Sequence, residues 1–396
     1  MATAVLLAGA SALAAEGGVA SASGGGATAS HGSQAAHSPS PYRGDGMWIW
    51  YVGESSGGHL ARIARKAHRR GMDTVYIKSS DGSYAWSQFT RALVSYLHHR
   101  NLRVCAWQFV YGIHPGAEAR RGAEAVRKGA DCLVIDAEAS YEGRYGAADT
   151  YVDKLRRRVG ASFPTALTSF PFVDYHPGFP YSVFLGRGGA RYNLPQLYWR
   201  TIGVSVGEGY EHTFRFNRVY RREIYPLGQT YDNPPKRELR RFRRMAISYD
   251  FGGVNWWSWQ ETNRREWRAL RRHVKGPIPG AGRYGDGYPP LSKGSRGDLV
   301  VWAQEHLKGA GQSVPVTGYF GDITRRAVRR FQRSKGYADV GRIGPRTWRA
   351  LLRVTPRMVD WSSRSSRPAA KRPAASAPRS ATLPALRYEI PPPAER

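Results

Sequence analysis

The feature that most constrains the fold is an eightfold alternation of short apolar runs with longer amphipathic stretches. Each apolar run has the length of a buried strand, and the apolar residues between two runs recur at helical spacing. Strands that alternate with helices in this way form a parallel sheet. The predicted strands are 46–52, 74–79, 103–110, 132–138, 165–170, 193–199, 224–230 and 252–259.

Six of the connecting stretches carry a clear helical pattern, whereas the fifth and sixth connections are weaker. Residues 171–191 are rich in Pro, Gly and Tyr and predict a loop over the open end of the sheet. Eight strand–helix units over 44–276 predict a (β/α)8 barrel of the α/β class. An open doubly wound sheet is the alternative, which the uniform period and the lack of a Gly-rich nucleotide turn disfavour. The predicted helices are 59–70, 86–100, 116–129, 147–159, 235–249 and 264–274.

Two carboxylates end the fourth predicted strand, which runs from Cys132 to Glu138. Asp136 and Glu138 are two residues apart, so both side chains lie on the same side of the strand. Acids at the end of a buried strand are costly unless they are used or paired. Because this end of a barrel strand faces the active site, we predict that Asp136 and Glu138 are catalytic. A structural acid paired with an arginine is the alternative for Asp136.

We use the word mouth for the carboxyl ends of the eight strands. The predicted mouth is aromatic, acidic and rich in amides, and amphipathic rings offer flat apolar surfaces with polar edges that suit sugar rings. The alternative for each aromatic residue is a place in the core. No metal and no cofactor is predicted, since metal-ligand spacing, a Gly-x-Ser-x-Gly turn and a phosphate loop are all missing from the sequence. The predicted substrate-binding residues are Asp81, Gln108, Gln196, Tyr198, Gln229, Trp257 and Trp259.

The acid pair and the eighth strand resemble known glycosidase families. Asp136-x-Glu138 resembles the acid pair of family 18 chitinase-type and family 25 lysozyme-type barrels, and residues 252–257 (Gly-Gly-Val-Asn-Trp-Trp) are similar to the eighth strand of chitinase-type barrels. The chain departs from the chitinase-type motif at residues 133–135, where Leu-Val-Ile stands in place of further Asp residues. It also lacks the strand-1 Asp of the lysozyme-type barrel.

This resemblance implies a glycoside hydrolase that acts on peptidoglycan or another N-acetylhexosamine glycan. It implies that Glu138 is the general acid and that Asp136 orients it or holds the substrate acetamido group. It further implies that Gln196 and Tyr198 hold the acetamido oxygen, above a floor made by Trp257 or Trp259. The alternative is a non-catalytic peptidoglycan-binding or scaffold protein on a degenerate barrel, which the missing strand-1 acid favours.

A second domain is predicted over 291–354, after a Pro/Gly/Tyr-rich linker at 277–290. Three short helical patterns follow one another, the second beginning near Asp322 and the third at Gly344-Pro345. The motifs Gly294-x-x-Gly297, Phe320-Gly-Asp-Ile-Thr, Phe331-Gln and Gly-Pro-x-x-Trp348 resemble the type 1 peptidoglycan-binding domain. This resemblance implies that peptidoglycan is a partner of the chain.

The two ends of the chain predict export and disorder. Residues 1–43 resemble a signal segment followed by a Gly/Ala/Ser linker, and residues 355–396 form a Pro/Ala/Arg/Ser-rich tail. The apolar stretch 3–15 is too short to span a membrane. We therefore predict a secreted, monomeric protein associated with the cell wall.

The formal net charge of +30 is extreme for 396 residues. Anionic wall polymers would attract such a chain, and so would nucleic acid. Arginine on solvated helix faces is the alternative without a partner. Because no nucleic-acid-binding fold is apparent, no nucleic-acid partner is predicted.

The two cysteines of the chain are predicted to be buried thiols. Cys105 and Cys132 lie on neighbouring strands. If Gln108 and Asp136 both point into the barrel, the two cysteines face opposite sides of the sheet, which excludes a disulfide between them.

Overall fold

The computed structural model describes residues 40–271, 273–282 and 287–364. The predicted signal-like segment with most of its linker, and the predicted tail from residue 365 onward, lie outside the described residues.

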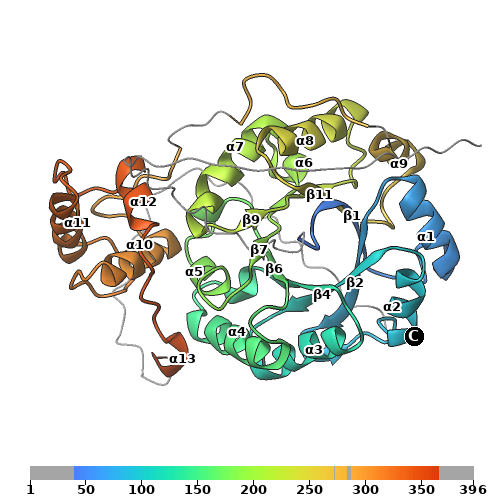
Figure 1. Ribbon diagram of the computed structural model, residues 1–396, viewed down its shortest axis with the longest axis horizontal. Coiled ribbons are helices and arrows are strands. Elements are labelled where there is room, and N and C mark those ends of the chain that lie inside the picture. The colour runs from blue at the N-terminus through green and yellow to red at the C-terminus, as the bar shows by residue number, and fades with distance from the viewer. Residues whose placement is uncertain (1–39, 272, 283–286, 365–396) are drawn as a thin grey trace, which may run out of the picture. The chain divides into compact units, whose positions relative to one another are not determined.

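Parallel strands form a barrel with helices around its outside (Figure 1). A short antiparallel strand, β3 (Tyr84–Ala85), pairs with the end of β2. The other strands are β1 (Gly44–Ile49), β2 (Thr74–Asp81), β4 (Arg103–Val110), β5 (Cys132–Ala137), β6 (Thr165–Thr168), β7 (Tyr192–Asn193), β8 (Gln196–Leu197), β9 (Glu223–Ile224), β10 (Leu227–Gln229) and β11 (Gly253–Trp257).

The strand order is β8-β10-β11-β1-β2-β4-β5-β6-β7-β9. Between β7 and β8 lies Pro195, and between β9 and β10 lies Pro226; proline has no N–H group for the ladder, so each of these strands is broken in two. Because β7 pairs with β9 and β8 pairs with β10, the two broken strands lie side by side, and β11 returns to β1. The predicted barrel with eight strand positions is confirmed.

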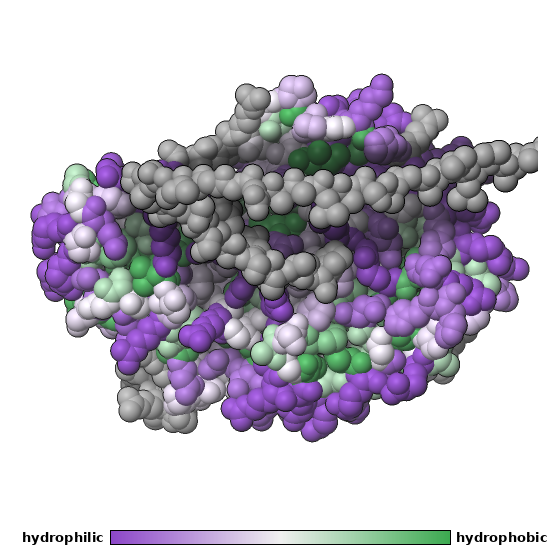
Figure 2. All heavy atoms as spheres, viewed as in Figure 1, coloured by the Kyte–Doolittle hydropathy of each residue, from purple (hydrophilic) through white to green (hydrophobic). Residues whose placement is uncertain are grey.

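The six predicted helices each bury one face outside the barrel, whereas the helices at Tyr181–Phe184, inside the stretch predicted as a loop, and at Val206–Asn217 were not predicted. In α1 (Leu60–Arg69) the side chains of Ile63, Ala64 and Ala67 are buried, while Arg65 and Arg69 are exposed. Figure 2 shows hydrophilic side chains gathered over the outer helices. The other helices around the barrel are α2 (Arg91–His98), α3 (Pro115–Arg127), α4 (Tyr145–Val159), α5 (Tyr181–Phe184), α6 (Trp199–Ile202), α7 (Val206–Asn217), α8 (Lys236–Ser248) and α9 (Arg264–Arg271). Short 3-10 turns lie at Ser56–Gly58, Ala139–Tyr141, Val173–Tyr175 and Arg218–Tyr220.

The strand residues alternate between the barrel interior and the layer between sheet and helices. One interior layer runs across four neighbouring strands, where Trp48, Tyr76, Cys105 and Cys132 are in register. A layer nearer the mouth aligns Phe109 with Asp136. Trp107 and Val134 form a further interior layer between these two, whereas Ala106 and Gln108 point outward into the helical shell.

The prediction of two free thiols is wrong, because Cys105 and Cys132 form a disulfide with a Cα–Cα distance of 4.6 Å. The two residues are directly paired in the ladder between β4 and β5. The prediction failed because it assumed that Gln108 points into the barrel. Gln108 points outward, so Cys105, three residues earlier, points inward beside Cys132.

The C-terminal residues form a small helical domain. Its helices are held by two buried glutamines. The side chain of Gln304 accepts hydrogen bonds from the backbone N–H groups of Thr317 and Gly318, and the Oε1 atom of Gln332 accepts one from Gly341. The helices are α10 (Asp298–Gly309), α11 (Asp322–Ser334) and α12 (Pro345–Leu351), and a further short helix, α13 (Trp361–Arg364), packs against α4.

Helix α10 packs against the barrel side through a buried carboxylate. Asp298 accepts hydrogen bonds from the N–H and the hydroxyl of Ser182 and from the hydroxyls of Tyr145 and Tyr220. Burial raises the pKa of Asp298 to about 6, although these four donors oppose the rise. Residues 355–364, assigned to the tail by sequence, also pack here, since Asp149 accepts from the N–H groups of Trp361 and Ser362.

Candidate active site

The predicted acids Asp136 and Glu138 lie together at the mouth. Asp136 is almost fully buried at the end of β5, and Glu138, just past the strand, is half-buried. The Nε2 atom of Gln196, at the start of β8, donates to Asp136 Oδ1 at 3.1 Å and to Glu138 Oε1 at 2.9 Å. A single amide group therefore bridges the two acids and fixes their relative orientation.

Burial raises the pKa of both carboxyl groups above the ordinary range. For Asp136 the next cause is the charge of Glu138, which also raises the pKa, whereas the nearby Lys78 lowers it. For Glu138 the hydrogen bonds from Gln196 and from the Asp136 carboxyl lower the pKa and partly offset burial. Because the two carboxyl groups interact directly, they titrate as a pair and not independently.

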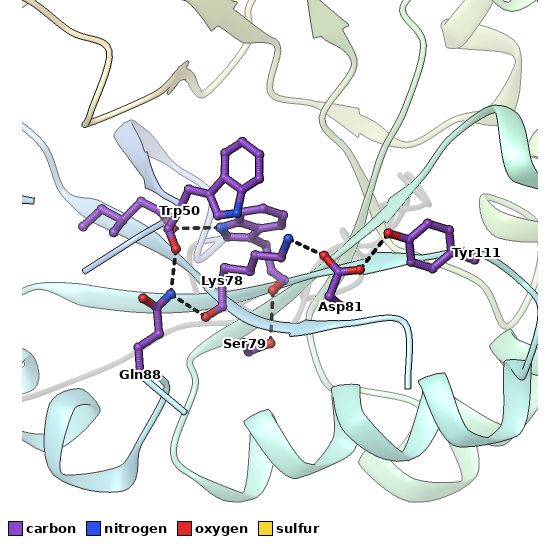
Figure 3. Close-up of polar contacts among 8 residues, drawn as sticks. Trp50, Lys78, Ser79, Asp81, Gln88 and Tyr111 are labelled. Atoms are coloured by element: carbon purple, nitrogen blue, oxygen red, sulfur yellow. Dashed lines mark hydrogen bonds and ion pairs between the residues drawn. The ribbon is translucent and has the colours of Figure 1, made fainter. Parts of the chain in front are cut away.

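A buried lysine lies in the same mouth, on β2. The Nζ atom of Lys78 forms an ion pair with Asp81 Oδ2 at 2.5 Å, and Asp81 Oδ1 accepts a hydrogen bond from the Tyr111 hydroxyl at 2.7 Å. Figure 3 shows this chain of contacts from Lys78 through Asp81 to Tyr111. Burial and the Asp81 carboxylate raise the pKa of Tyr111, so its hydroxyl stays protonated as a donor.

The aromatic residues of the mouth gather around Trp257. This side chain is half-buried at the end of β11, and its ring lies 5.4 Å from that of Trp107 and 5.8 Å from that of Trp50. The half-buried Tyr198 follows β8 directly after Gln196-Leu197, and its ring packs edge-on against Tyr231 at 5.5 Å. Burial raises the pKa of Tyr198, and the neighbouring Tyr231 and the charges of Asp136 and Glu138 raise it further.

The structure places three of the predicted substrate-binding residues elsewhere. Gln108 is fully buried on the helix side of β4, where it donates to the Glu118 carbonyl and accepts from the Tyr151 hydroxyl. Trp259 is buried beneath α1 and α9, with its ring 5.0 Å from Trp267.

Gln229 lies near the mouth but is fully buried, and its Oε1 atom accepts hydrogen bonds from the N–H groups of Arg200 and Thr201 at the start of α6. It therefore shapes the loop after β8. The predicted residues that the structure brings together are Asp81, Asp136, Glu138, Gln196, Tyr198 and Trp257.

Lys78 is a residue of the mouth that the sequence analysis did not identify. The signal that identifies it is a single lysine at the end of an otherwise apolar strand, Thr74-Val-Tyr-Ile-Lys78, because a lysine is almost never buried without a partner. Among the described residues, no group of three or more His, Cys, Asp or Glu side chains is placed to hold a metal ion.

Two hollows in the described part of the chain lie away from the acid pair. One is lined by Trp199, Arg200 and Arg241 among others, and the second by Arg187, Lys308 and Arg357 with neighbouring residues. Neither hollow includes Asp136 or Glu138, which are distinguished by their burial and hydrogen bonds rather than by concavity. Within the described ranges, no helix is long and apolar enough to cross a membrane.

The C-terminal domain has a family match. Residues 296–351 match the family model described as "Putative peptidoglycan binding domain", which confirms the sequence prediction for this part of the chain. A comparison with curated proteins finds no match.

Solved structures similar to the barrel include several glycosidases. A chitinase from Chromobacterium violaceum is 11% identical, covers 58% of this chain and 98% of its own, and gives a TM-score of 0.45. The spore cortex-lytic enzyme SleL of Bacillus cereus is 9% identical, with 60% and 76% covered and a TM-score of 0.46. A fungal endo-β-N-acetylglucosaminidase of glycosyl hydrolase family 18 is 12% identical, with 57% and 95% covered and a TM-score of 0.43.

Proposed function

We propose that this protein is a cell-wall glycan hydrolase that cleaves a bond next to an N-acetylhexosamine, with Glu138 as the general acid. The observation that carries the proposal is the bridged acid pair, in which Gln196 holds Asp136 and Glu138 together at the barrel mouth. A buried pair with one proton is the arrangement that a glycosidase needs to protonate a leaving group near neutral pH.

Glu138 is the more exposed member of the pair and therefore the one that reaches the glycosidic oxygen. Its proton passes to that oxygen as the bond to the anomeric carbon breaks. The acetamido oxygen of the substrate forms a new bond to the same carbon, so no second carboxylate is needed across the sugar. Water then attacks the anomeric carbon, the bond to the acetamido oxygen breaks, and the proton of the water passes to the Glu138 carboxylate.

The amide of Gln196 has a different role from the one that the resemblance implied. Its nitrogen donates to both acids and is therefore not free for the acetamido oxygen. Tyr198 remains to hold the acetamido group, and Trp257 remains as the sugar floor. The indole nitrogen of Trp50 is buried and has no hydrogen-bond partner among the described residues, so it is a donor that a sugar hydroxyl would satisfy.

The helical domain supports a wall glycan as the substrate, because its family model is one for peptidoglycan binding. We further propose that the protein is exported. The disulfide between Cys105 and Cys132 supports this, since disulfides persist in oxidising compartments and are rare in reducing ones.

The intact chain is expected to sediment with insoluble peptidoglycan. With an insoluble neutral glucan, the protein should instead stay in the supernatant. The net charge of +30 adds a component that weakens as salt is raised from 0.15 to 1 M, while the domain's own binding persists. The fraction of protein in the pellet measures both components. Complete release at high salt would contradict specific recognition, because it would leave only charge attraction.

Tyr198→Phe is expected to lower turnover by roughly 2- to 10-fold, the effect of one hydrogen bond worth about 0.5–1.5 kcal/mol. The ring and its packing against Tyr231 are kept, so the melting temperature should change little. Release of reducing sugars from peptidoglycan gives the rate. Tyr231→Phe is the matched control on the neighbouring ring, and an equal loss in both variants would remove the special role of Tyr198.

A further inference from the structure

A break in the regular pairing of β2 brings two charged residues to the same face of the strand. Lys78 is opposite Trp107 and Ser80 is opposite Gln108, so Ser79 is an extra residue in β2. In a regular strand, residues three apart face opposite sides. The bulge at Ser79 lets both Lys78 and Asp81 point into the barrel, and bulges of this kind re-aim side chains next to active sites.

The bulge is held by specific contacts. The Ser79 hydroxyl donates to the Trp107 carbonyl at 3.1 Å, and the Gln88 amide donates to the carbonyls of Lys78 and Trp50 at 3.0 and 2.7 Å (Figure 3). These residues come from four different segments of the barrel. The inward direction of Lys78 is therefore fixed by the surrounding structure.

The ammonium group of Lys78 is enclosed. Its side chain is 4% exposed, and Nζ lies 4.4 to 5.1 Å from the ring centres of Trp50, Trp86 and Trp107. Indole faces stabilise a cation, and Asp81 neutralises it. A buried cation in the mouth of a barrel, anchored so completely, is not explained by the hydrolase mechanism above.

The register places this cation beside the acid pair. Asp81 is opposite Phe109, and Phe109 is opposite Asp136, so the two aspartates lie in the same layer on either side of β4. Two strand spacings put their backbones about 10 Å apart. Because Lys78 Nζ contacts Asp81, its charge lies at the level of Asp136.

We propose that Lys78 is a positioning residue of the active site, whose ammonium group, fixed by Asp81 and three indoles, sets the proton occupancy of the Asp136–Glu138 pair. This inference rests on the proposed hydrolase function. The mechanism requires that Asp136 and Glu138 share one proton. The fixed positive charge of Lys78 favours loss of a second proton from the pair, and the carboxylate of Asp81 limits that effect. The other titratable groups that face the pair are Tyr111, Tyr198 and His176.

The charge effect has a direction that can be tested. Lys78 lowers the pKa of Asp136, whereas Asp81 raises it. Lys78→Met keeps the length of the side chain and removes the charge, so the titration of the pair should move to higher pH. Asp81→Asn leaves the lysine charge without a counter-charge, so the titration should move to lower pH. Loss of packing alone would not move the titration midpoints of the two variants in opposite directions.

The experiment measures the pair in the intact chain by two readouts. Carboxyl 13C chemical shifts, assigned with Asp136→Asn and Glu138→Gln, give the titration midpoints without any need for turnover. The pH profile of sugar release from peptidoglycan gives the same midpoints from activity. For Lys78→Met we expect an upward shift of about one pH unit or more, which corresponds to removal of a unit charge within roughly 10 Å at an effective dielectric constant near 20.

Two further variants complete the test. Lys78→Arg keeps the charge and should restore the wild-type midpoints. Lys66→Met is the matched control, because Lys66 also lies over two indoles, Trp259 and Trp267, but on the helix side of the barrel. Unchanged midpoints in Lys78→Met, or shifts of the same sign in Lys78→Met and Asp81→Asn, would overturn the proposal. Shifts as expected in a chain without turnover would support the role of Lys78 and refute the hydrolase function.

Discussion

Glu138→Gln is expected to lower turnover by about 10²- to 10⁴-fold, because the amide cannot donate the proton that the leaving oxygen needs. Glutamine has the same shape, and Gln196 can still contact its side-chain oxygen. Glycan affinity and thermal stability should therefore stay close to those of the wild type. Sugar release from peptidoglycan, together with sedimentation of the variant with the same glycan, separates rate from binding.

Glu124→Gln is the matched control, since Glu124 is a partly exposed glutamate of α3 that pairs with Arg121. A wild-type rate in Glu138→Gln would contradict the assignment and direct attention to Glu261, which follows β11 and accepts a hydrogen bond from Ser258. A protein that only binds the wall has no turnover to lose. In that case glycan affinity should depend on Trp257 and be indifferent to Glu138.

Removal of the disulfide is expected to lower the free energy of unfolding by about 3–4 kcal/mol. The bridge joins residues 27 apart, and the chain-entropy estimate for a loop of this length gives that size. Both cysteines are buried inside the barrel, so removal of the disulfide destabilises the interior layer of the barrel and not its surface. Denaturant unfolding of the oxidised chain and of Cys105→Ala measures the difference.

The single and double cysteine variants decide whether the bridge exists in solution. If Cys105 and Cys132 are bonded, either alanine substitution breaks the same bond, and the double variant should lose little more than each single one. Two independent buried thiols would instead give losses that add. Additive losses, together with no effect of a reductant on the wild type, would contradict the disulfide.

The barrel and the position of the acid pair could be predicted because they depend on periodicity. Apolar runs mark the strands, and two acids at the end of such a run belong to the mouth whatever the details of the loops. The strand predicted at 103–110 coincides with β4 (Arg103–Val110), which is regular along its length. The helical domain was predictable for a second reason, since its Gly and Gln residues hold particular turns.

The side-chain directions could not be predicted with the same success. Because side chains alternate along a strand, one wrong assumption about direction makes every other direction in that strand wrong. The assumption that Gln108 points inward therefore placed Cys105 on the outside and excluded the disulfide. In β2 the bulge at Ser79 breaks the alternation, and no residue type in Lys78-Ser-Ser-Asp81 predicts a bulge. Trp259 was assigned to the mouth by continuing the eighth strand, which ends at Trp257.

The shortness of α5 has a consequence for how the two domains depend on each other. The fifth helical position of the barrel holds only Tyr181–Phe184, and Asp298 of α10 accepts from the N–H of Ser182 in its first turn. Trp302 of the same helix donates to the Val219 carbonyl just before β9. Helix α10 thus packs on the sector of the barrel whose strands are broken at Pro195 and Pro226. A barrel severed from this helix would lose part of its own outer layer, so the barrel depends on the helical domain for its packing in this sector.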